Sequence, residues 1–177
     1  TLELALPAEF VDEAALPLIL DPLIGTNFAI SSGGDDANPD VAYDAGNDLW
    51  LVVWTRGFSA TDSDIRAQRV DVNGNLVGGM ISITNNSQLS WNPAVANVRK
   101  NEAFLVCWQQ GPTNTGPWDV RAVWVSAEFG TVSNDGAIDV GGADATNPTA
   151  SGEASPQHGE ALVAWEIGGG DLGVAQI

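Results

Sequence analysis

The fold is decided by three short segments that recur along the chain: Asn92-Pro93-Ala94-Val95-Ala96, Leu105-Val106-Cys107-Trp108 and Asp119-Val120-Arg121-Ala122. An earlier copy consists of Asn38-Pro39-Asp40-Val41-Ala42, Leu51-Val52-Val53-Trp54 and Asp64-Ile65-Arg66-Ala67. A later copy consists of Asn147-Pro148-Thr149-Ala150 and Leu162-Val163-Ala164-Trp165, and it ends near Asp171. The repeated tryptophans are 54 and then 57 residues apart. Repeats of this period predict an array in which each unit buries its apolar face against its neighbours.

Within each copy the local signals are those of β-strands. In the first copy, β-branched and aromatic runs at 41–43 and 49–54 flank a polar turn, and residues 66–72 alternate polar with apolar side chains. Asn73-Gly74 then favours a tight hairpin into a fourth strand at 76–83. In the second copy the same plan predicts strands at 95–97, 103–108, 120–125 and 137–140. We expect the three repeated prolines at strand starts, where a missing N–H does least harm.

The two chain ends are out of register with the repeat. Residues 21–31 align with the fourth strand of the first copy, and the chain closes on the first three strands of the last copy. This offset predicts an N-terminal arm at 1–20 and a β-repeat domain at 21–177, with two whole four-stranded units and one unit split between the termini.

Units of this length, with Asn-Pro-x-Val-Ala, Leu-Val-x-Trp and Asp-Ile/Val-Arg-Ala strands, resemble the blades of bacterial secreted β-propeller-like repeat proteins. The resemblance implies an all-β, propeller-like fold and carries over no catalytic residue. Propellers typically have about 4–8 blades, more than this chain encodes. The alternatives are a ring of two chains, an open fibre, a piece of a longer repeat chain, or another β architecture such as a sandwich.

Charge and composition exclude several classes of partner. The chain carries a formal charge of −17, and its six cations all lie between Arg56 and Arg121. Such a chain repels nucleic acid and anionic membranes, and no apolar run reaches the length of a membrane span. We therefore expect no nucleic-acid partner, no membrane insertion, and a location outside the cell or at its surface.

Acidic loops supply the candidate metal ligands. Asp62 and Asp64 lie two residues apart in the loop before the third strand, and hard oxygen ligands at alternate positions suit calcium. The alternative is architectural, because Asp64, Asp119 and Asp171 recur with the repeat and Arg66 and Arg121 recur beside two of them. No other cofactor is expected.

Nothing in the sequence assembles a catalytic device, so we expect no enzyme and no catalytic residue. Cys107 replaces Val53 and Ala164 of the other copies and is expected in the core. His158, the only histidine, is expected in a solvated turn. Trp91 and Trp118 fall in loops, where exposed aromatic faces stack on sugar rings or on a partner.

The leading functional hypothesis is a secreted, non-enzymatic assembly protein that self-associates into a ring or fibre. In this hypothesis an N-terminal strand enters a neighbouring subunit and fills its apolar slots with Leu23, Ile24, Phe28 and Ile30. The alternative is a propeller module that binds a carbohydrate or a protein, with Trp91 and Trp118 as ligand-binding candidates. A hydrolase is the third hypothesis.

Overall fold

The computed structural model describes residues 27–133, 136–139 and 142–177, and this part of the chain is nearly all β. The predicted all-β fold class is therefore confirmed. In the described residues no helix is long and apolar enough to cross a lipid bilayer. The elements are β1 (Asp35–Asp44), β2 (Leu49–Ser59), β3 (Asp62–Asp71), β4 (Leu76–Ser82), β5 (Leu89–Val98), η1 (Arg99–Asn101), β6 (Ala103–Gly111), β7 (Asp119–Ser126), β8 (Gly136–Asp139), β9 (Ala145–Gly152), β10 (Ala161–Ile167) and β11 (Asp171–Gln176).

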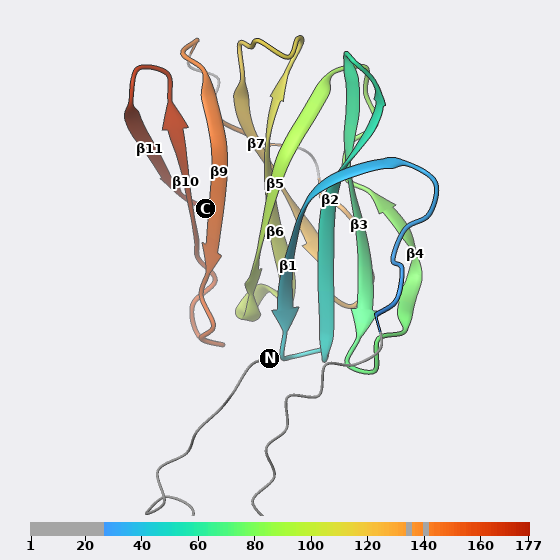
Figure 1. The fold of residues 1–177 in the computed structure, drawn as a ribbon. Coiled ribbons are helices and arrows are strands. Elements are labelled where there is room, and N and C mark those ends of the chain that lie inside the picture. The colour runs from blue at the N-terminus through green and yellow to red at the C-terminus, as the bar shows by residue number, and fades with distance from the viewer. Residues whose placement is uncertain (1–26, 134–135, 140–141) are drawn as a thin grey trace, which may run out of the picture.

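The strands form three antiparallel units, which stand side by side in Figure 1. Blade 1 is β1–β4, blade 2 is β5–β8 and blade 3 is β9–β11. One parallel pairing, Ser63 with Leu89, joins the sheets of blades 1 and 2. The first strands of the blades, β1, β5 and β9, pack next to one another. The strand order predicted for the first two copies is confirmed.

The predicted split blade is not confirmed. Of the segment 21–31, residues 27–31 form no strand, and residues 21–26 lie outside the described residues, as does the predicted boundary between residues 20 and 21. Within the described residues the sheet of blade 3 has three strands. The prediction compared side chains alone. A strand also needs a neighbouring strand for its backbone hydrogen bonds, and the alignment did not test whether one was available.

Each repeated Asn-Pro pair forms a β-bulge opposite the repeated tryptophan. In blade 2, Trp91 pairs with Gln109 and Ala94 with Cys107, so Asn92 and Pro93 together oppose Trp108 alone. The same two-against-one register occurs at Trp54 in blade 1 and at Trp165 in blade 3. The bulge explains why the chain repeats both elements of the motif at a nearly constant spacing.

The chemistry of the pair suits this bulge. The asparagines have positive φ, 50° at Asn38, 48° at Asn92 and 52° at Asn147, a conformation that Asn tolerates better than most residues. The following proline has no N–H, and the unpaired position of a bulge needs none. The expectation of prolines at strand starts is therefore wrong: the prolines lie inside β1, β5 and β9, at the one interior position where the ladder is interrupted.

Neighbouring blades stack through apolar faces. We call the face toward the preceding blade the leading face and the face toward the following blade the trailing face. The leading face carries Val95, Phe104 and Val106 in blade 2, and the trailing face carries Leu51, Val53, Ile65 and Ala67 in blade 1; these residues form one buried cluster. A second cluster joins the trailing face of blade 2 to the leading face of blade 3 and contains Leu105, Cys107, Val120, Ala122, Ala161, Val163 and Trp165. The expected core position of Cys107 is confirmed, and burial raises the pKa of its thiol to about 12.

Polar bonds reinforce the contact between blades 1 and 2. The Asp40 carboxylate accepts the backbone N–H of Val95 at 2.8 Å, which ties β1 to β5. Arg69, buried on the trailing face of blade 1, donates to the backbone carbonyls of Ala127, at 3.1 Å, and Glu128. These bonds satisfy backbone groups that a neighbouring sheet edge otherwise leaves without partners.

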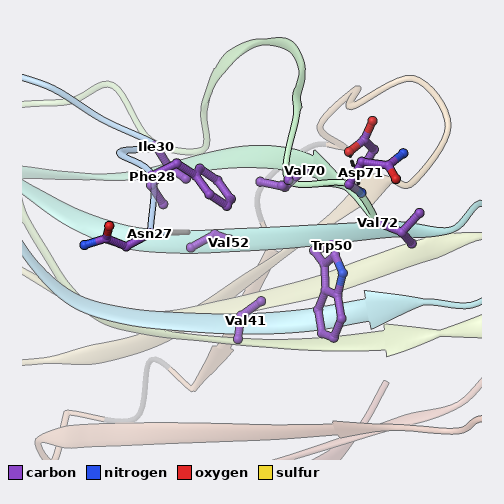
Figure 2. A pocket seen from close by; sticks show the side chains of 11 residues that line it. Asn27, Phe28, Ile30, Val41, Trp50, Val52, Val70, Asp71 and Val72 are labelled. Atoms are coloured by element: carbon purple, nitrogen blue, oxygen red, sulfur yellow. Dashed lines mark hydrogen bonds between the residues drawn. The ribbon is translucent and has the colours of Figure 1, made fainter. Parts of the chain in front are cut away.

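Within residues 27–133, 136–139 and 142–177, no blade packs against the leading face of blade 1. Its exposed side chains include Val41 and Trp50, and Phe28 and Ile30 lie over this face, where they help to line a hollow of about 640 Å³ (Figure 2). At the other end of the array, Leu162, Leu172 and Val174 are exposed on the trailing face of blade 3. Equivalent positions are thus buried between blades and exposed at the ends.

Two aspartates at the same end of blade 1 bond to neighbouring segments, and the first of them is Asp36. Its carboxylate accepts Arg56 Nε at 2.8 Å, Arg56 Nη2 at 2.9 Å and Trp54 Nε1 at 3.0 Å, and the Ser31 hydroxyl also donates to it. The hydrogen bond from Arg56 is the main cause that lowers the pKa of Asp36 to about 2. The indole N–H of the repeated tryptophan is thereby satisfied, as it is in blade 3 by Asp139 at 2.8 Å.

The second such residue is Asp64, which is buried in β3. It pairs with Arg66 at 2.8 Å, and the two side chains are 4% and 8% exposed. Its other oxygen accepts the Thr84 hydroxyl at 3.0 Å and the backbone N–H of Asn86 at 3.3 Å. Arg66 also donates to the Thr84 carbonyl at 2.6 Å. The network holds the segment after β4 against β3.

We predict that truncation of one valine has different costs at equivalent positions of two blades. Val95 is 6% exposed and Val41 is 51% exposed. Val95→Ala should lower the free energy of unfolding by about 2 kcal/mol, because it removes buried methyl groups and leaves a cavity. Val41→Ala should change it by less than about 0.5 kcal/mol. Urea unfolding followed by tryptophan fluorescence measures both; equal losses would contradict the description of the two faces.

The Asp36 cluster predicts an acid-dependent loss of stability. A carboxylate whose pKa is depressed on folding stabilises the fold above its unfolded value, near 3.8, and this contribution is lost as the pH falls toward about 2. Asp36→Asn should therefore be less stable than the wild type at neutral pH, and the difference should shrink over that window. Urea midpoints across the window test this, with Asp35→Asn as the matched control, and a constant difference would refute it.

The Asp64 network predicts a large effect from removal of one charge. Asp64→Asn should destabilise the protein by about 3 kcal/mol, because it leaves the buried guanidinium of Arg66 without a counter-charge. Asp62→Asn, two residues away, should cost less than about 1 kcal/mol. Chemical unfolding with and without added calcium measures both. If the two variants lose equal amounts of stability, and do so only when calcium is present, the result would favour a calcium site on the two aspartates instead.

Candidate functional site

A cleft of about 440 Å³ lies where blades 1 and 2 meet, at the end where β1 and β5 begin. It is lined by Asp35, Gly57, Ser59, Ala60, Ser63, Leu89, Trp91, Asn92, Gln109, Asn114 and Trp118. These residues come from the β2–β3 turn, the starts of β1, β3 and β5, the end of β6 and the loop that precedes β7. We call it the Trp91–Trp118 cleft. The structure thus brings together Trp91 and Trp118, which the sequence analysis identified as separate candidates.

Hydrogen bonds between Ser63 of β3 and the backbone of the segment around Ser90 join the two blades at the cleft. The Ser63 hydroxyl donates to the Ser90 carbonyl at 2.9 Å and accepts the Ser90 N–H at 3.1 Å. The Ser63 N–H donates to the Gln88 carbonyl at 3.2 Å. Because both serines are buried, these bonds join β3 to β5 without access of bulk water. The two walls of the cleft are therefore held at a fixed separation.

Trp118 is held by its backbone and by a glycine. Its N–H donates to the Asp144 carboxylate at 2.9 Å, and its carbonyl accepts the Ala145 N–H at 2.8 Å, so blade 3 anchors the loop. A Cβ at Gly111 would stand 3.0 Å from the Trp118 ring and 2.6 Å from the Pro117 carbonyl oxygen. Glycine is required there because the indole lies directly on the end of β6.

A chain of amides extends from the cleft toward blade 3. Asn92 donates to Gln109 at 3.3 Å and to Asn147 at 3.0 Å. Gln109 also accepts the Asn147 N–H at 2.9 Å, and the Asn147 side chain donates to Glu166 at 3.2 Å. Asn92 and Asn147 are the bulge residues of their blades, so the bulge aims two amides at the junction of neighbouring first strands.

The lining suits an uncharged, hydroxyl-rich ligand. Trp91 and Trp118 are each half-buried, so each offers part of an apolar ring while the surroundings hold it in place. The amides of Asn92, Gln109 and Asn114 and the carboxylate of Asp35 supply donors and acceptors. Among these described lining residues there is no Lys, Arg or His. The cleft therefore offers no cation for a phosphate or a carboxylate.

The other predicted site residues lie elsewhere. Neither Asp62 nor Asp64 is among the cleft-lining residues, and the oxygens of Asp64 contact Arg66, Thr84 and Asn86. The calcium prediction for these aspartates stays a prediction. Leu23 and Ile24 lie outside the described residues, whereas Phe28 and Ile30 lie over blade 1.

The polar residues that line the cleft were not among the candidate site residues predicted from the sequence. Asn92 was assigned only to the repeat motif, and Gln109 follows directly after the repeated tryptophan Trp108. Gln109 did carry a signal. A strand that continues through the core would have an apolar residue next to the repeated tryptophan, and this strand has an amide instead. Asp35 and Asn114 carry no such signal, since acidic and amide residues are ordinary in turns.

No protein-family model matches the sequence, and no curated protein matches it. Among solved structures, the chain is similar to an endo-arabinase from Bacteroides thetaiotaomicron VPI-5482, with a TM-score of 0.56 and 10% sequence identity. The match covers 87% of this chain and 60% of that one, so this chain spans about 60% of the length of the endo-arabinase. That enzyme is a propeller-type glycoside hydrolase.

At this identity the likeness shows the fold alone, and it confirms the predicted propeller-like architecture. The number of blades in a closed ring is not shown, since no sheet of the described residues closes. Membership in the bacterial secreted repeat proteins stays a prediction.

The expected role as a non-enzymatic assembly protein is wrong. The finding that overturns it is the structural neighbour, which is an endo-arabinase and not an assembly protein. The expectation inferred assembly from a blade count too small to close a ring. A blade count describes how sheets are arranged, whereas function depends on the loops at their ends. The expectation that the chain is not an enzyme is in mild conflict with the same finding.

Proposed function

We propose that this protein is a carbohydrate-binding propeller-like module, and that its Trp91–Trp118 cleft holds a sugar chain. The observation that carries the proposal is the convergence of two half-buried indoles of blade 2 with Asp35 of blade 1 and a row of amides. Trp118 comes from the loop before β7, as expected, whereas Trp91 lies in β5 and not in the expected loop. The likeness to an endo-arabinase supports a glycan as the ligand. Such a module works outside the cell or at its surface, where long glycans are accessible.

The chemistry of sugars matches each part of this lining. One face of a pyranose or furanose ring presents C–H groups, which pack on an indole, while the ring edge presents hydroxyls. Each hydroxyl both donates and accepts, and amide and carboxylate groups can bond two neighbouring hydroxyls at once. Because backbone bonds between blades hold the walls of the cleft, the ordering cost of binding falls mainly on the ligand.

Charge narrows the class of glycan to neutral sugars. The chain carries a formal charge of −17, and the cleft itself contains the carboxylate of Asp35. A uronic-acid polymer would meet repulsion that is strongest at low ionic strength. A neutral polymer, such as a pentose or hexose chain, meets none.

We predict that each cleft tryptophan contributes to glycan affinity. Trp118→Ala and Trp91→Ala should each weaken binding about tenfold, since loss of an aromatic stacking contact is worth about 1–1.5 kcal/mol. A glycan array that includes arabinan identifies the ligand, and titration calorimetry measures its affinity. Trp50→Ala is the matched control, because Trp50 is exposed on the leading face of blade 1, away from the cleft.

Two results would overturn the proposal. One is failure of the intact chain to bind any glycan on the array, and the other is an equal loss of affinity in the Trp50 control. A hydrolysis assay on each bound polysaccharide accompanies the titration. Release of shorter chains would show that the cleft also cleaves its ligand, as the neighbouring glycoside hydrolase does.

A further inference from the structure

We propose that Glu153, His158 and Glu160 form a binding site for a divalent transition-metal ion of the zinc class. One ligand atom from each residue, an imidazole nitrogen and two carboxylate oxygens, lies within 4.8 Å of the other two. The site is at the β9–β10 hairpin of blade 3 and does not share residues with the Trp91–Trp118 cleft. The two proposals are therefore independent.

The hairpin brings the two glutamates together. Glu153 directly follows the end of β9 and Glu160 directly precedes β10. The N–H of Glu153 donates to the carbonyl of Glu160 at 3.1 Å, so the two residues face each other across the end of the ladder. His158 belongs to the connecting loop, and one of its ring nitrogens lies within 4.8 Å of a carboxylate oxygen of each glutamate.

Blade 2 holds this hairpin in place. The N–H of Arg99 in η1 donates to the Glu153 carbonyl at 3.3 Å. The Asn101 side chain donates to the Gly159 carbonyl at 3.1 Å, one residue after His158. The backbone on both sides of the three ligands is thus anchored, which lowers the ordering cost of binding an ion.

Electrostatics at the group favours a cation. In the described chain no hydrogen bond and no ion pair within 4.0 Å joins His158 to either glutamate, so the three donors converge without satisfying one another. Neither Arg99 nor Lys100, the cations on the adjacent η1, forms an ion pair with these carboxylates. Residues 122–177 contain no Lys or Arg. Two carboxylates at this separation repel, and a bound divalent ion removes the repulsion.

The ligand set selects the metal. Imidazole nitrogen suits zinc, copper and nickel, whereas calcium and magnesium prefer oxygen alone. Three protein ligands with a water in the remaining position is a common zinc arrangement. Ligands about 2.0–2.2 Å from a tetrahedral ion lie about 3.4 Å apart. Because the three ligand atoms lie within 4.8 Å of one another, the side chains must approach by up to about 1.4 Å. The exposed His158 and Glu160 can make that movement. The histidine distinguishes this group from the purely acidic clusters that are common on such a surface.

We predict one zinc ion per chain, with His158 as a ligand. Zinc chloride is titrated by calorimetry into the untagged 177-residue protein after chelator treatment. The imidazole signals are followed by proton NMR, and the assignment is unambiguous because the chain has one histidine. Zinc should shift those signals in saturable fashion, and excess calcium should not reverse the shift. His158→Ala, Glu153→Gln and Glu160→Gln should each weaken binding at least tenfold.

Matched controls come from the same loop and from a distant glutamate. Gln157→Ala removes an exposed side chain next to the site, and Glu128→Gln removes an exposed carboxylate on blade 2; both should bind zinc as the wild type does. The proposal is overturned if zinc leaves the imidazole signals unshifted. It is also overturned if His158→Ala or the two glutamate variants bind zinc with wild-type affinity. All five variants alter exposed or half-exposed side chains, so each is expected to fold.

Discussion

The repeated bulge, two residues opposite one tryptophan, is the constraint on which the rest of the structure depends. It interrupts the ladder in the middle of the first strand of each blade, at the one point where Asn-Pro is compatible with a β-strand. The interruption increases local twist, and strongly twisted sheets are those that stack around a common axis instead of lying flat.

The same bulge connects architecture to the candidate site. A residue at positive φ directs its side chain out of the regular alternation, and here Asn92 and Asn147 turn toward each other between blades. Gln109, next to the tryptophan that faces the bulge, completes the amide row. A single local backbone feature therefore defines both the spacing of the blades and the polar end of the cleft.

The sequence was sufficient for the repeat, the strands and the class of fold, because periodic burial is written directly in the order of residues. It was insufficient for the prolines, whose place inside β1, β5 and β9 depends on a register that only paired strands reveal. Trp91 and Trp118 were recognised one by one, but their convergence depends on the pairing of β5 with β6 and on the packing of Trp118 against Gly111 at the end of β6. Glu153 and Glu160 become neighbours only once β9 and β10 pair.

The prediction of function failed for a related reason. An incomplete set of blades was interpreted as a need for partners, although the same incompleteness has no bearing on the loops that carry a ligand. Asp64 illustrates the opposite case: its recurrence with Arg66 indicated an architectural pair, and the structure shows the two bonded and buried. Recurrence in a repeat marks what the fold needs, and residues without counterparts in the other copies mark what one blade does alone.

The alternation of leading and trailing faces has an evolutionary consequence. Each blade presents one face of each kind, so a tandem duplication of a segment of 54 residues would insert a blade that already fits both of its neighbours. Selection on the inserted copy would begin with its packing solved, and its loops would be free to diverge. In a blade at an end of the array, selection on packing would be relaxed on one face. Leu172 of blade 3 is 77% exposed, whereas Val120, at the equivalent position of blade 2, is fully buried. The fold therefore tolerates changes in its own length.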